Sequence, residues 1–294
     1  MELPAKSGTD PLADLLAHLH ARRLRVWSIV VTLFGDAVVP RGGEVWLGVI
    51  RQLLSRLDVE SGTLGAAMSR LTADGWLERR KEGRLSFYRL AETGRRTFEA
   101  AARRIYAGRI TTPWDGRWTL VLETSSEPAR VSALSSAGFG RLDSRVWARP
   151  GGQGEVEVEG LVFEATVRSE SEALRSAVRE AWDLDAVAER YRRFVVRFRR
   201  LAEEGGALEP LDAMAARTLL VHDYRRLVLR DPRLPLDLLP KSWPGAEAHE
   251  VAEQAYRAML SASEAWLDAG DRTPDGPLPP PGEDFHRRFG GLGP

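Results

Sequence analysis

The chain has 294 residues, of which 43% are hydrophobic, so it is long enough to bury two or three small cores. It contains no cysteine, which excludes disulfide bonds, thiolate catalysis and cysteine zinc sites. The longest apolar run, Val26–Phe34, is much shorter than the roughly 20 residues of a membrane span, and the first ten residues lack the pattern of a signal peptide. We therefore expect a multidomain cytoplasmic protein with no membrane partner.

The charges are unevenly distributed along the chain, although 42 Lys and Arg balance 42 Asp and Glu. Between Arg22 and Arg109 there are 17 Lys and Arg against 9 Asp and Glu, and the remainder of the chain is correspondingly acidic. A local basic excess provides the electrostatic attraction by which proteins bind nucleic-acid phosphates. The basic part is therefore expected to face DNA.

Helices are predicted first in this basic part. Asp10 and Pro11 are typical of a helix start, and two amphipathic segments follow at Val26–Phe34 and Val45–Leu57. These segments provide the first two helices of a compact three-helix arrangement.

A third helix is predicted from the spacing of Leu64, Met68 and Leu71, which place an apolar stripe on one face. Gly75 follows where a helix C-terminus commonly takes a left-handed residue. The other face is polar and free to enter a groove. The residues predicted to lie near the major groove are Thr63, Ser69 and Arg70.

A basic hairpin is predicted directly after this helix. Leu77 begins an extended run, Glu82–Arg84 forms a turn, and Leu85–Leu90 alternates apolar and polar residues. Helices followed by such a hairpin are typical of a winged helix-turn-helix. The residues predicted to contact phosphates or the minor groove are Arg79, Arg80, Lys81, Arg84 and Ser86.

Two structural alternatives to DNA binding stay open for this segment. The helix and hairpin are also compatible with an ordinary fold whose basic tip is simply solvated. Arg70 is also compatible with a salt bridge to Asp74, one helical turn away.

The middle of the chain has the pattern of a small α+β domain. After a helix at Thr93–Tyr106, strands and helices alternate in the order β-α-β-β-α, which is close to a ferredoxin-like arrangement. The predicted elements are Trp118–Glu123, Pro128–Ala137, Val146–Ala148, Val156–Gly160, Leu161–Val167 and a helix that reaches Trp182. Long helices follow from Leu184 to Asp268, and the proline-rich end predicts no packed element.

These patterns predict a multidomain α+β protein. A winged helix-turn-helix domain occupies residues 11–112, a ferredoxin-like domain residues 113–183, a helical C-terminal domain residues 184–270, and a flexible tail residues 271–294.

Several segments of the chain resemble the PaaX-type regulators of phenylacetic acid degradation, a family of bacterial transcriptional repressors. The resemblance extends over nearly the whole sequence. The segments that carry it are SIVVTLFGD (28–36), RGGEVWL (41–47), SRLTADGWL (69–77), GRLSFYRL (83–90), WDGRW (114–118), LPLDLLP (234–240) and WPG (243–245).

The resemblance implies a winged-helix domain, a central ferredoxin-like domain similar to the Cas2 fold, a helical C-terminal domain and a homodimer. It also implies that operator double-stranded DNA is released when an acyl-CoA effector such as phenylacetyl-CoA binds. The chain departs from similar sequences at Gly65, where they usually carry an arginine, so operator specificity is expected to differ.

A candidate effector site is suggested by His222, Arg225 and Arg226, which lie at helical contact spacing, together with Trp243. Arginine pairs bind phosphates, and a tryptophan can line an apolar slot for an aromatic acyl group. The alternative is that His222 and Trp243 are core residues and that the arginines form ion pairs within the protein.

Catalysis is not expected, and the sequence predicts no catalytic residue, cofactor or metal site. The nucleophile-elbow, phosphate-loop and zinc-protease motifs are absent from the sequence. A Cas2-like nuclease, with Glu123 as a lone acidic ligand, and an acyl-CoA hydrolase stay open as alternatives. Within regulators, control of another catabolic pathway and activation rather than repression also stay open.

Overall fold

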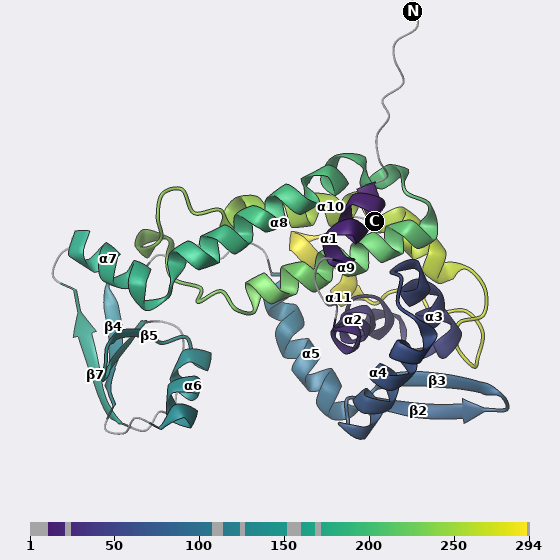
Figure 1. Cartoon of the computed structure of the whole chain (residues 1–294), viewed down its shortest axis with the longest axis horizontal. Coiled ribbons are helices and arrows are strands. Elements are labelled where there is room, and N and C mark those ends of the chain that lie inside the picture. Colours follow the sequence, from purple (N-terminus) through teal and green to yellow (C-terminus); the bar gives the residue numbers. More distant parts are fainter. Residues whose placement is uncertain are drawn as a thin grey trace, which may run out of the picture. The chain divides into compact units, whose positions relative to one another are not determined.

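The computed structural model describes residues 11–20, 25–107, 114–123, 127–151, 160–167 and 172–292. The protein is a mixed α+β structure, as predicted, with one three-stranded and one four-stranded sheet in these ranges (Figure 1). It divides into two compact units: unit 1 comprises residues 1–108, 193–229 and 247–294, and unit 2 comprises residues 109–192 and 230–246. None of the helices in the described ranges has the length and apolar character needed to cross a membrane.

Unit 1 begins with four helices, of which the second is central. Every side chain of this helix except Trp27 is buried, because its sequence VWSIVVTL is apolar on all sides. It packs against the fourth helix and against a later helix, α9 (Pro210–Val228). The four helices are α1 (Pro11–His20), α2 (Val26–Leu33), α3 (Leu47–Arg56) and α4 (Ser61–Ala73).

The connection between α2 and α3 differs from the prediction. It continues α2 as a buried π-helical turn, η1 (Phe34–Val38), and a 3-10 turn, η2 (Val39–Arg41). A short strand, β1 (Glu44–Trp46), then stands where the predicted helix began at Val45. Val45 pairs with Tyr88 of a distant hairpin strand, and local periodicity does not encode this pairing.

The predicted hairpin is confirmed as β2 (Leu77–Glu82) and β3 (Leu85–Leu90), which pair antiparallel in the sheet order β1-β3-β2. Gly83 opens the two-residue connection with a φ of +56°, a left-handed conformation that favours glycine. Gly75 has a φ of +71° just beyond the end of α4, as its position predicted.

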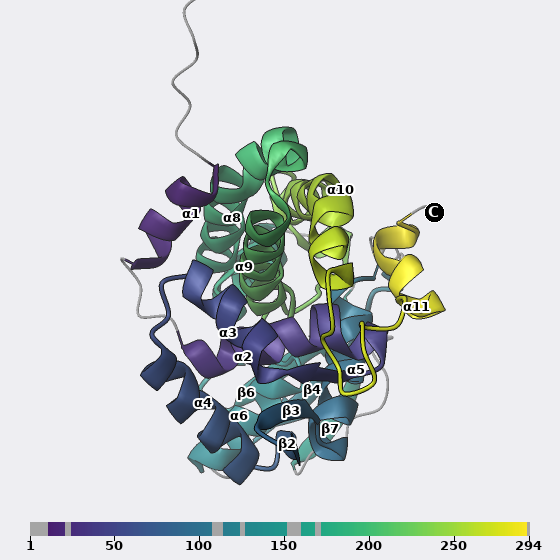
Figure 2. The same ribbon diagram turned by 90° about the vertical axis from the view of Figure 1, so that its right-hand side faces the viewer.

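The remaining helices of unit 1 surround α9. Figure 2 shows α9 between α8 and α10, with α2 and α3 beneath it. The buried residues of α9 run continuously from Ala213 to His222, so this helix also belongs to the core. The surrounding helices are α5 (Glu92–Ile105), α8 (Leu184–Glu204) and α10 (Gly245–Asp268), of which α8 belongs to unit 1 from Arg193 onward and α10 from Glu247 onward.

Residues 271–292 are folded, which corrects the prediction of a flexible tail. They contain a short helix, α11 (Glu283–His286), and a 3-10 turn, η5 (Arg288–Gly290). Phe285, Arg288 and Phe289 are buried in unit 1. Composition misled the prediction, because the prolines of residues 274–281 are typical of an unfolded segment, whereas three large side chains that follow them are buried in the core.

Unit 2 contains a fully antiparallel sheet with the strand order β5-β6-β4-β7. Sequence reasoning missed β5, where Gly140 allows close approach: a Cβ there would lie 2.5 Å from the Trp182 ring. The predicted strand at Val156–Gly160 lies almost wholly outside the described residues. The strands are β4 (Arg117–Leu122), β5 (Gly140–Asp143), β6 (Val146–Pro150) and β7 (Leu161–Thr166), and the helices are α6 (Pro128–Ser136) and α7 (Glu172–Ala181).

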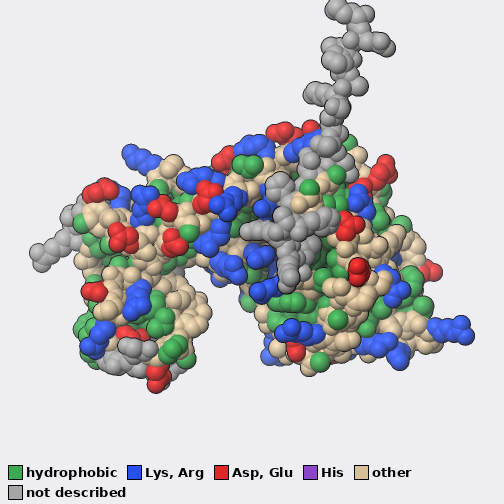
Figure 3. Space-filling model, in the orientation of Figure 1, with side chains coloured by type: hydrophobic (Ala, Val, Ile, Leu, Met, Phe, Trp, Pro, Cys, Tyr) green, Lys and Arg blue, Asp and Glu red, His purple; other side chains and the backbone are tan. Residues whose placement is uncertain are grey.

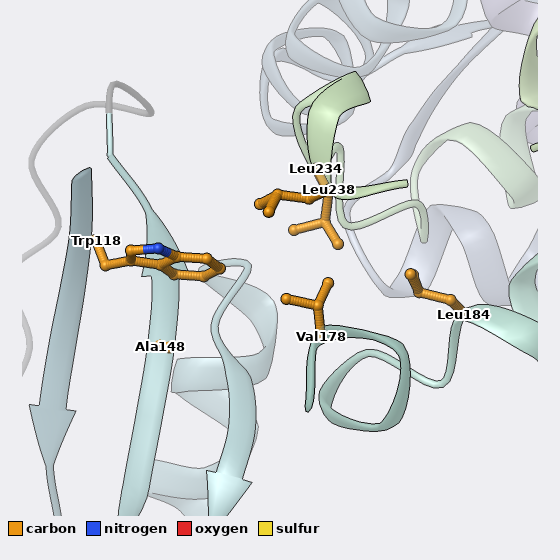
Figure 4. Close-up of a cluster of buried hydrophobic side chains, with 6 residues drawn as sticks. All are labelled: Trp118, Ala148, Val178, Leu184, Leu234 and Leu238. Carbon is orange, nitrogen blue, oxygen red and sulfur yellow. The ribbon is translucent and has the colours of Figure 1, made fainter. Parts of the chain in front are cut away.

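The core of unit 2 joins residues from distant parts of the sequence (Figure 4). One buried cluster consists of Trp118, Ala148, Val178, Leu184, Leu234 and Leu238, and a second consists of Val121, Leu134, Phe139 and Trp147. The predicted helical domain at residues 184–270 is therefore not a separate compact unit, because residues 230–246 belong to unit 2 and most of its helices to unit 1. The apolar side chains of α9 and α10 are buried in unit 1, where α9 also packs against α1, α2, α3 and α5. The helices of the predicted C-terminal domain therefore share a core with the N-terminal helices.

Candidate nucleic-acid interface

Helix α4 separates its residues onto two faces as the sequence pattern predicted. Leu64, Met68 and Leu71 are buried, and the helix packs against α2 and α3. Thr63, Ser69 and Arg70 are all exposed. The structure therefore leaves the three residues predicted to read bases on the solvent side of one helix.

Arg70 forms the alternative contact considered from the sequence, an ion pair with Asp74. The Arg70 Nε and Asp74 Oδ2 atoms are 3.4 Å apart, and the two side chains are 74% and 53% exposed. Exposed pairs of this kind contribute little to stability. The guanidinium can therefore leave Asp74 for another partner at small cost.

Arg79 and Ser86 are diagonal neighbours on one face of the hairpin, and their side chains form a hydrogen bond. The Arg79 Nη2 atom donates a hydrogen bond of 2.7 Å to the Ser86 hydroxyl, and the guanidinium lies 6.0 Å from the centre of the Tyr88 ring. Ser86 is buried. Ser86 thus positions Arg79 in this structure, whereas the sequence suggested that it contacts DNA itself.

Arg80 lies on the opposite face of β2 from Arg79, because side chains alternate along a strand. Its Nη2 atom is 2.9 Å from Glu44 Oε2 in β1, and its guanidinium lies over the Phe87 ring. Glu44 offsets the charge of Arg80, so Arg80 contributes less positive potential than an unpaired arginine would.

Lys81 and Arg84 are exposed at the free end of the hairpin, and neither has a carboxylate partner in the described part of the chain. Lys and Arg side chains gather at this protruding end (Figure 3). Unpaired cations on an exposed hairpin provide the largest electrostatic attraction for phosphates, because no internal anion must be displaced.

Arg51 was missed by sequence reasoning. It is exposed on α3, which packs against α4, and it forms no ion pair among the described residues. The sequence pattern could have identified Arg51 as exposed, because it lies outside the apolar stripe formed by Val49, Ile50, Leu53 and Leu54. We add Arg51 to the candidate interface.

Gly65 lies in the exposed part of α4, and a Cβ added there meets no atom within 4 Å. We expect Gly65→Ala to raise the free energy of unfolding of unit 1 by about 0.5–1 kcal/mol, because alanine restricts the unfolded chain and favours the helix. Chemical denaturation checks this. Gly83→Ala is the contrasting control, since the left-handed φ at Gly83 makes alanine destabilising there; a gain of stability in both variants would contradict the expectation.

Among the candidate effector residues, His222 is buried between α9 and α2. Its Nδ1 atom is 3.3 Å from the Thr32 hydroxyl, and the ring also bonds to the backbone of Ser28. Burial, followed by the positive charges of Arg225 and Arg226, lowers the pKa of His222 from 6.5 to about 3. His222 is therefore neutral at physiological pH.

The low pKa of His222 predicts acid-sensitive folding. Between about pH 3 and 6.5 the unfolded chain protonates His222 and the folded protein does not, so stability falls as pH falls through this window. Between pH 7 and 4.5 we expect wild-type protein to lose about 2–3 kcal/mol more than His222→Gln. Denaturation at both pH values checks this, and parallel losses in the two proteins would contradict it.

Arg225 and Arg226 lie in the last turn of α9, where Arg225 is largely buried and Arg226 is exposed. Arg225 donates to the hydroxyl and the carbonyl oxygen of Ser28. Trp243 belongs to unit 2, where its ring lies 5.9 Å from that of Tyr191 and packs on the core. His222, Arg225 and Arg226 are thus together in unit 1, and Trp243 is part of the other unit.

An exposed polar helix face followed by a hairpin with unpaired cations is typical of a nucleic-acid-binding protein. Comparisons with known proteins make the class more specific. The PaaX-like protein family matches residues 25–94, and the PaaX-like protein C-terminal domain matches residues 182–269. The chain is 34% identical over 287 residues to the transcriptional repressor PaaX of Escherichia coli (strain K12), covering 90% of each protein. The protein belongs to the PaaX-like family.

The fold is similar to that of a solved structure, the uncharacterized protein Rv0674 from Mycobacterium tuberculosis, which is 24% identical in sequence with a TM-score of 0.51. The match covers 75% of this chain and 90% of that one. It supports the mixed α+β architecture.

Proposed function

We propose that this protein is a DNA-binding transcriptional repressor whose α2, α3, α4 and β2–β3 hairpin form a winged helix-turn-helix. The observation that carries the proposal is the solvent face of α4, with Thr63, Ser69 and Arg70 exposed beside a basic hairpin. Membership of a family with a repressor supports it. The protein then acts in the cytoplasm as a regulator rather than an enzyme.

The proposed role of each side chain depends on its exposure and on how firmly another residue of the protein already holds it. Arg70, Thr63 and Ser69 enter the major groove, and Arg70 exchanges Asp74 for a base edge. Lys81 and Arg84 bind phosphates or the minor groove. Arg79 and Arg80 add weaker contacts, because Ser86 and Glu44 already hold them.

Unit 2 is proposed to be the ferredoxin-like, Cas2-like domain, and the repressor to act as a homodimer. Counted along the chain, the four strands have the spatial order 2-3-1-4, which is the strand order of a ferredoxin-like sheet. The observed α7 follows the last strand instead of preceding it. Two winged domains in a dimer fit the two half-sites of a typical operator.

The proposed effector is phenylacetyl-CoA or a related acyl-CoA that lowers operator affinity, and the regulated operon serves phenylacetate catabolism. Arg225 and Arg226 are the proposed phosphate-binding residues, with His222 beside them. No observation favours a nuclease, because Glu123 is buried with its carboxylate 3.4 Å from Arg130.

The test is a fluorescence-anisotropy titration of the purified protein on DNA from upstream of its own gene, against scrambled DNA of equal length. We expect at least about 1,000-fold tighter binding to the specific DNA. Arg70→Ala should reduce this discrimination by about 5–150-fold, while Arg96→Ala on α5 leaves it unchanged. Equal affinity for both DNAs would overturn the proposal, and sedimentation of the complex would show whether two chains bind.

A further inference from the structure

The C-terminal segment of the chain binds one edge of the sheet β1-β3-β2, which we call the wing sheet. β1 lies at the edge of this sheet, and the backbone N–H of Trp46 donates a 2.7 Å hydrogen bond to the carbonyl oxygen of Arg272. Arg272 belongs to the segment between α10 and α11 (Figure 1). The segment therefore covers part of a strand edge, a position at which an unpaired donor otherwise faces solvent.

Two left-handed glycines join the wing sheet to the preceding turn, η2. Gly42 and Gly43 have φ values of +84° and +82°, and β1 begins directly after them. Glycine moves between backbone conformations at little steric cost, so this pair forms a flexible joint. The C-terminal segment contacts the chain on both sides of the joint, because the Gly282 N–H donates to the Pro40 carbonyl at 3.0 Å and Arg272 accepts from β1.

The segment is itself anchored to α10. The Arg272 Nη2 atom donates to the Trp266 carbonyl oxygen at 2.5 Å, and the guanidinium lies 4.3 Å from the centre of the Trp266 ring. Arg41, buried at the end of η2, forms an ion pair of 2.9 Å with Glu264 and donates to the Pro279 carbonyl oxygen at 2.9 Å. The acceptor that holds β1 is thus fixed relative to a long helix of unit 1.

The outer half of the β2–β3 hairpin has no such support. Residues 80–85 are all exposed, whereas Leu77 at the base of the hairpin is buried. Arg84 lies three residues beyond Phe87, the partner of Trp46 in the wing sheet, which is about 10 Å along the strand. A small rotation of the base therefore displaces the hairpin end by a larger distance, and the direction of the hairpin depends on how firmly its base is held.

We propose that residues 271–282 act as a brace that fixes the direction of the hairpin for DNA binding, with the Arg272 carbonyl oxygen as the contact that holds the wing sheet. Cations on a hairpin that is already held in place bind phosphates with a smaller loss of conformational freedom, so the brace raises DNA affinity. This inference rests on the proposed function and adds a positioning role for the C-terminal segment.

The mobility of the hairpin is measured first, without DNA. Trp46 has a φ of −67°, which proline adopts, so Trp46→Pro removes the N–H donor, and Trp46→Ala removes the same ring but keeps the donor. Because the chain contains no cysteine, a nitroxide on Leu85→Cys, at a position that is 45% exposed in the hairpin, reports on this site alone. We expect its rotational correlation time to fall at least about twofold with Trp46→Pro and to stay unchanged with Trp46→Ala.

A nitroxide on Val196→Cys, exposed on α8, is the control for the fold of unit 1, and its spectrum should be the same in every variant. Arg272→Ala removes both anchors of the Arg272 side chain and replaces Trp46→Pro if proline disturbs the spectrum at Val196. We expect it to loosen the hairpin as well. Equal mobility at Leu85→Cys in the variant and in wild type would overturn the brace.

The consequence for DNA binding is measured by the operator titration. We expect Trp46→Pro to bind about 5–10-fold more weakly than Trp46→Ala. In a Lys81→Gln/Arg84→Gln background this difference should fall below about twofold, because the hairpin end no longer contributes phosphate contacts. The same difference in both backgrounds would contradict a role through the hairpin. Absence of specific DNA binding by wild type would instead reject the proposed function, since the mobility of the hairpin is measured without DNA.

Discussion

Arg288→Ala is expected to lower the free energy of unfolding of unit 1 by about 3–5 kcal/mol, because it breaks a buried ion cluster. Asp36, in η1, is fully buried and accepts hydrogen bonds from Arg288 Nη1 at 2.9 Å and from Arg217 Nε at 2.7 Å. Tyr106 and Tyr256 donate to the same carboxylate, at 2.6 Å and 3.0 Å.

The electrostatics of Asp36 support this expectation. Burial acts to raise its pKa, but Arg217, Arg288 and the hydrogen bond from Tyr106 together hold the pKa below its ordinary value. Removing Arg288 leaves the carboxylate with one counter-ion and leaves the Tyr256 hydroxyl without its donor. The large side chain of Arg288, which lies 4.0 Å from the centre of the Tyr106 ring, also leaves a cavity.

Chemical denaturation measures the loss, and hydrogen exchange of α2 compared with β4 assigns it to unit 1. Arg287→Ala is the matched control, because Arg287 is the preceding arginine, is 71% exposed and pairs only with exposed carboxylates. We expect it to change stability very little. Equal stability losses in the two variants would contradict a stabilising role for the buried ion pair of Arg288 and Asp36.

Reversing the charges at the hairpin end should have the largest effect on DNA binding. Lys81→Glu/Arg84→Glu is expected to weaken operator binding by at least about 100-fold at low salt, because both cations are exposed and neither pairs with a carboxylate among the described residues. The slope of log affinity against log salt should fall by about one for each phosphate contact removed. The fold should be unaffected, since neither side chain is buried.

The control for charge reversal is Arg199→Glu/Arg287→Glu, which makes the same change in net charge at two exposed arginines of unit 1 outside the hairpin. Anisotropy titrations between 50 and 200 mM salt compare the two variants with wild type. If both lose affinity equally, the effect comes from net charge alone and the hairpin is not the contact surface.

Local signals made part of the candidate interface predictable. The spacing of Leu64, Met68 and Leu71 fixed which face of α4 is buried, and Gly83 marked the hairpin turn. Both depend on contacts between residues close in sequence. The paired state of Arg80 was not predictable, because its partner Glu44 lies 36 residues earlier in a strand that periodicity missed.

Long-range contacts account for the other differences. Arg288 and Asp36 are separated by 252 residues, so the composition of the proline-rich end gave no sign that it is buried. The chain also returns to unit 2 between α9 and α10, where Leu234 and Leu238 complete the core with Trp118. Prediction from the sequence groups each segment with its neighbours along the chain. Both units of this protein are built from segments that are far apart in the sequence, so the predicted domain boundaries differ from the observed units.

The most direct test of a ligand-released repressor is a titration of the preformed complex of this protein and its upstream DNA with phenylacetyl-CoA, free phenylacetate and coenzyme A in parallel. We expect phenylacetyl-CoA to release the DNA, and the other two to have little effect at the same concentration. Specific DNA binding that none of the three weakens would contradict release by this acyl-CoA, and release by phenylacetate alone would contradict a thioester effector.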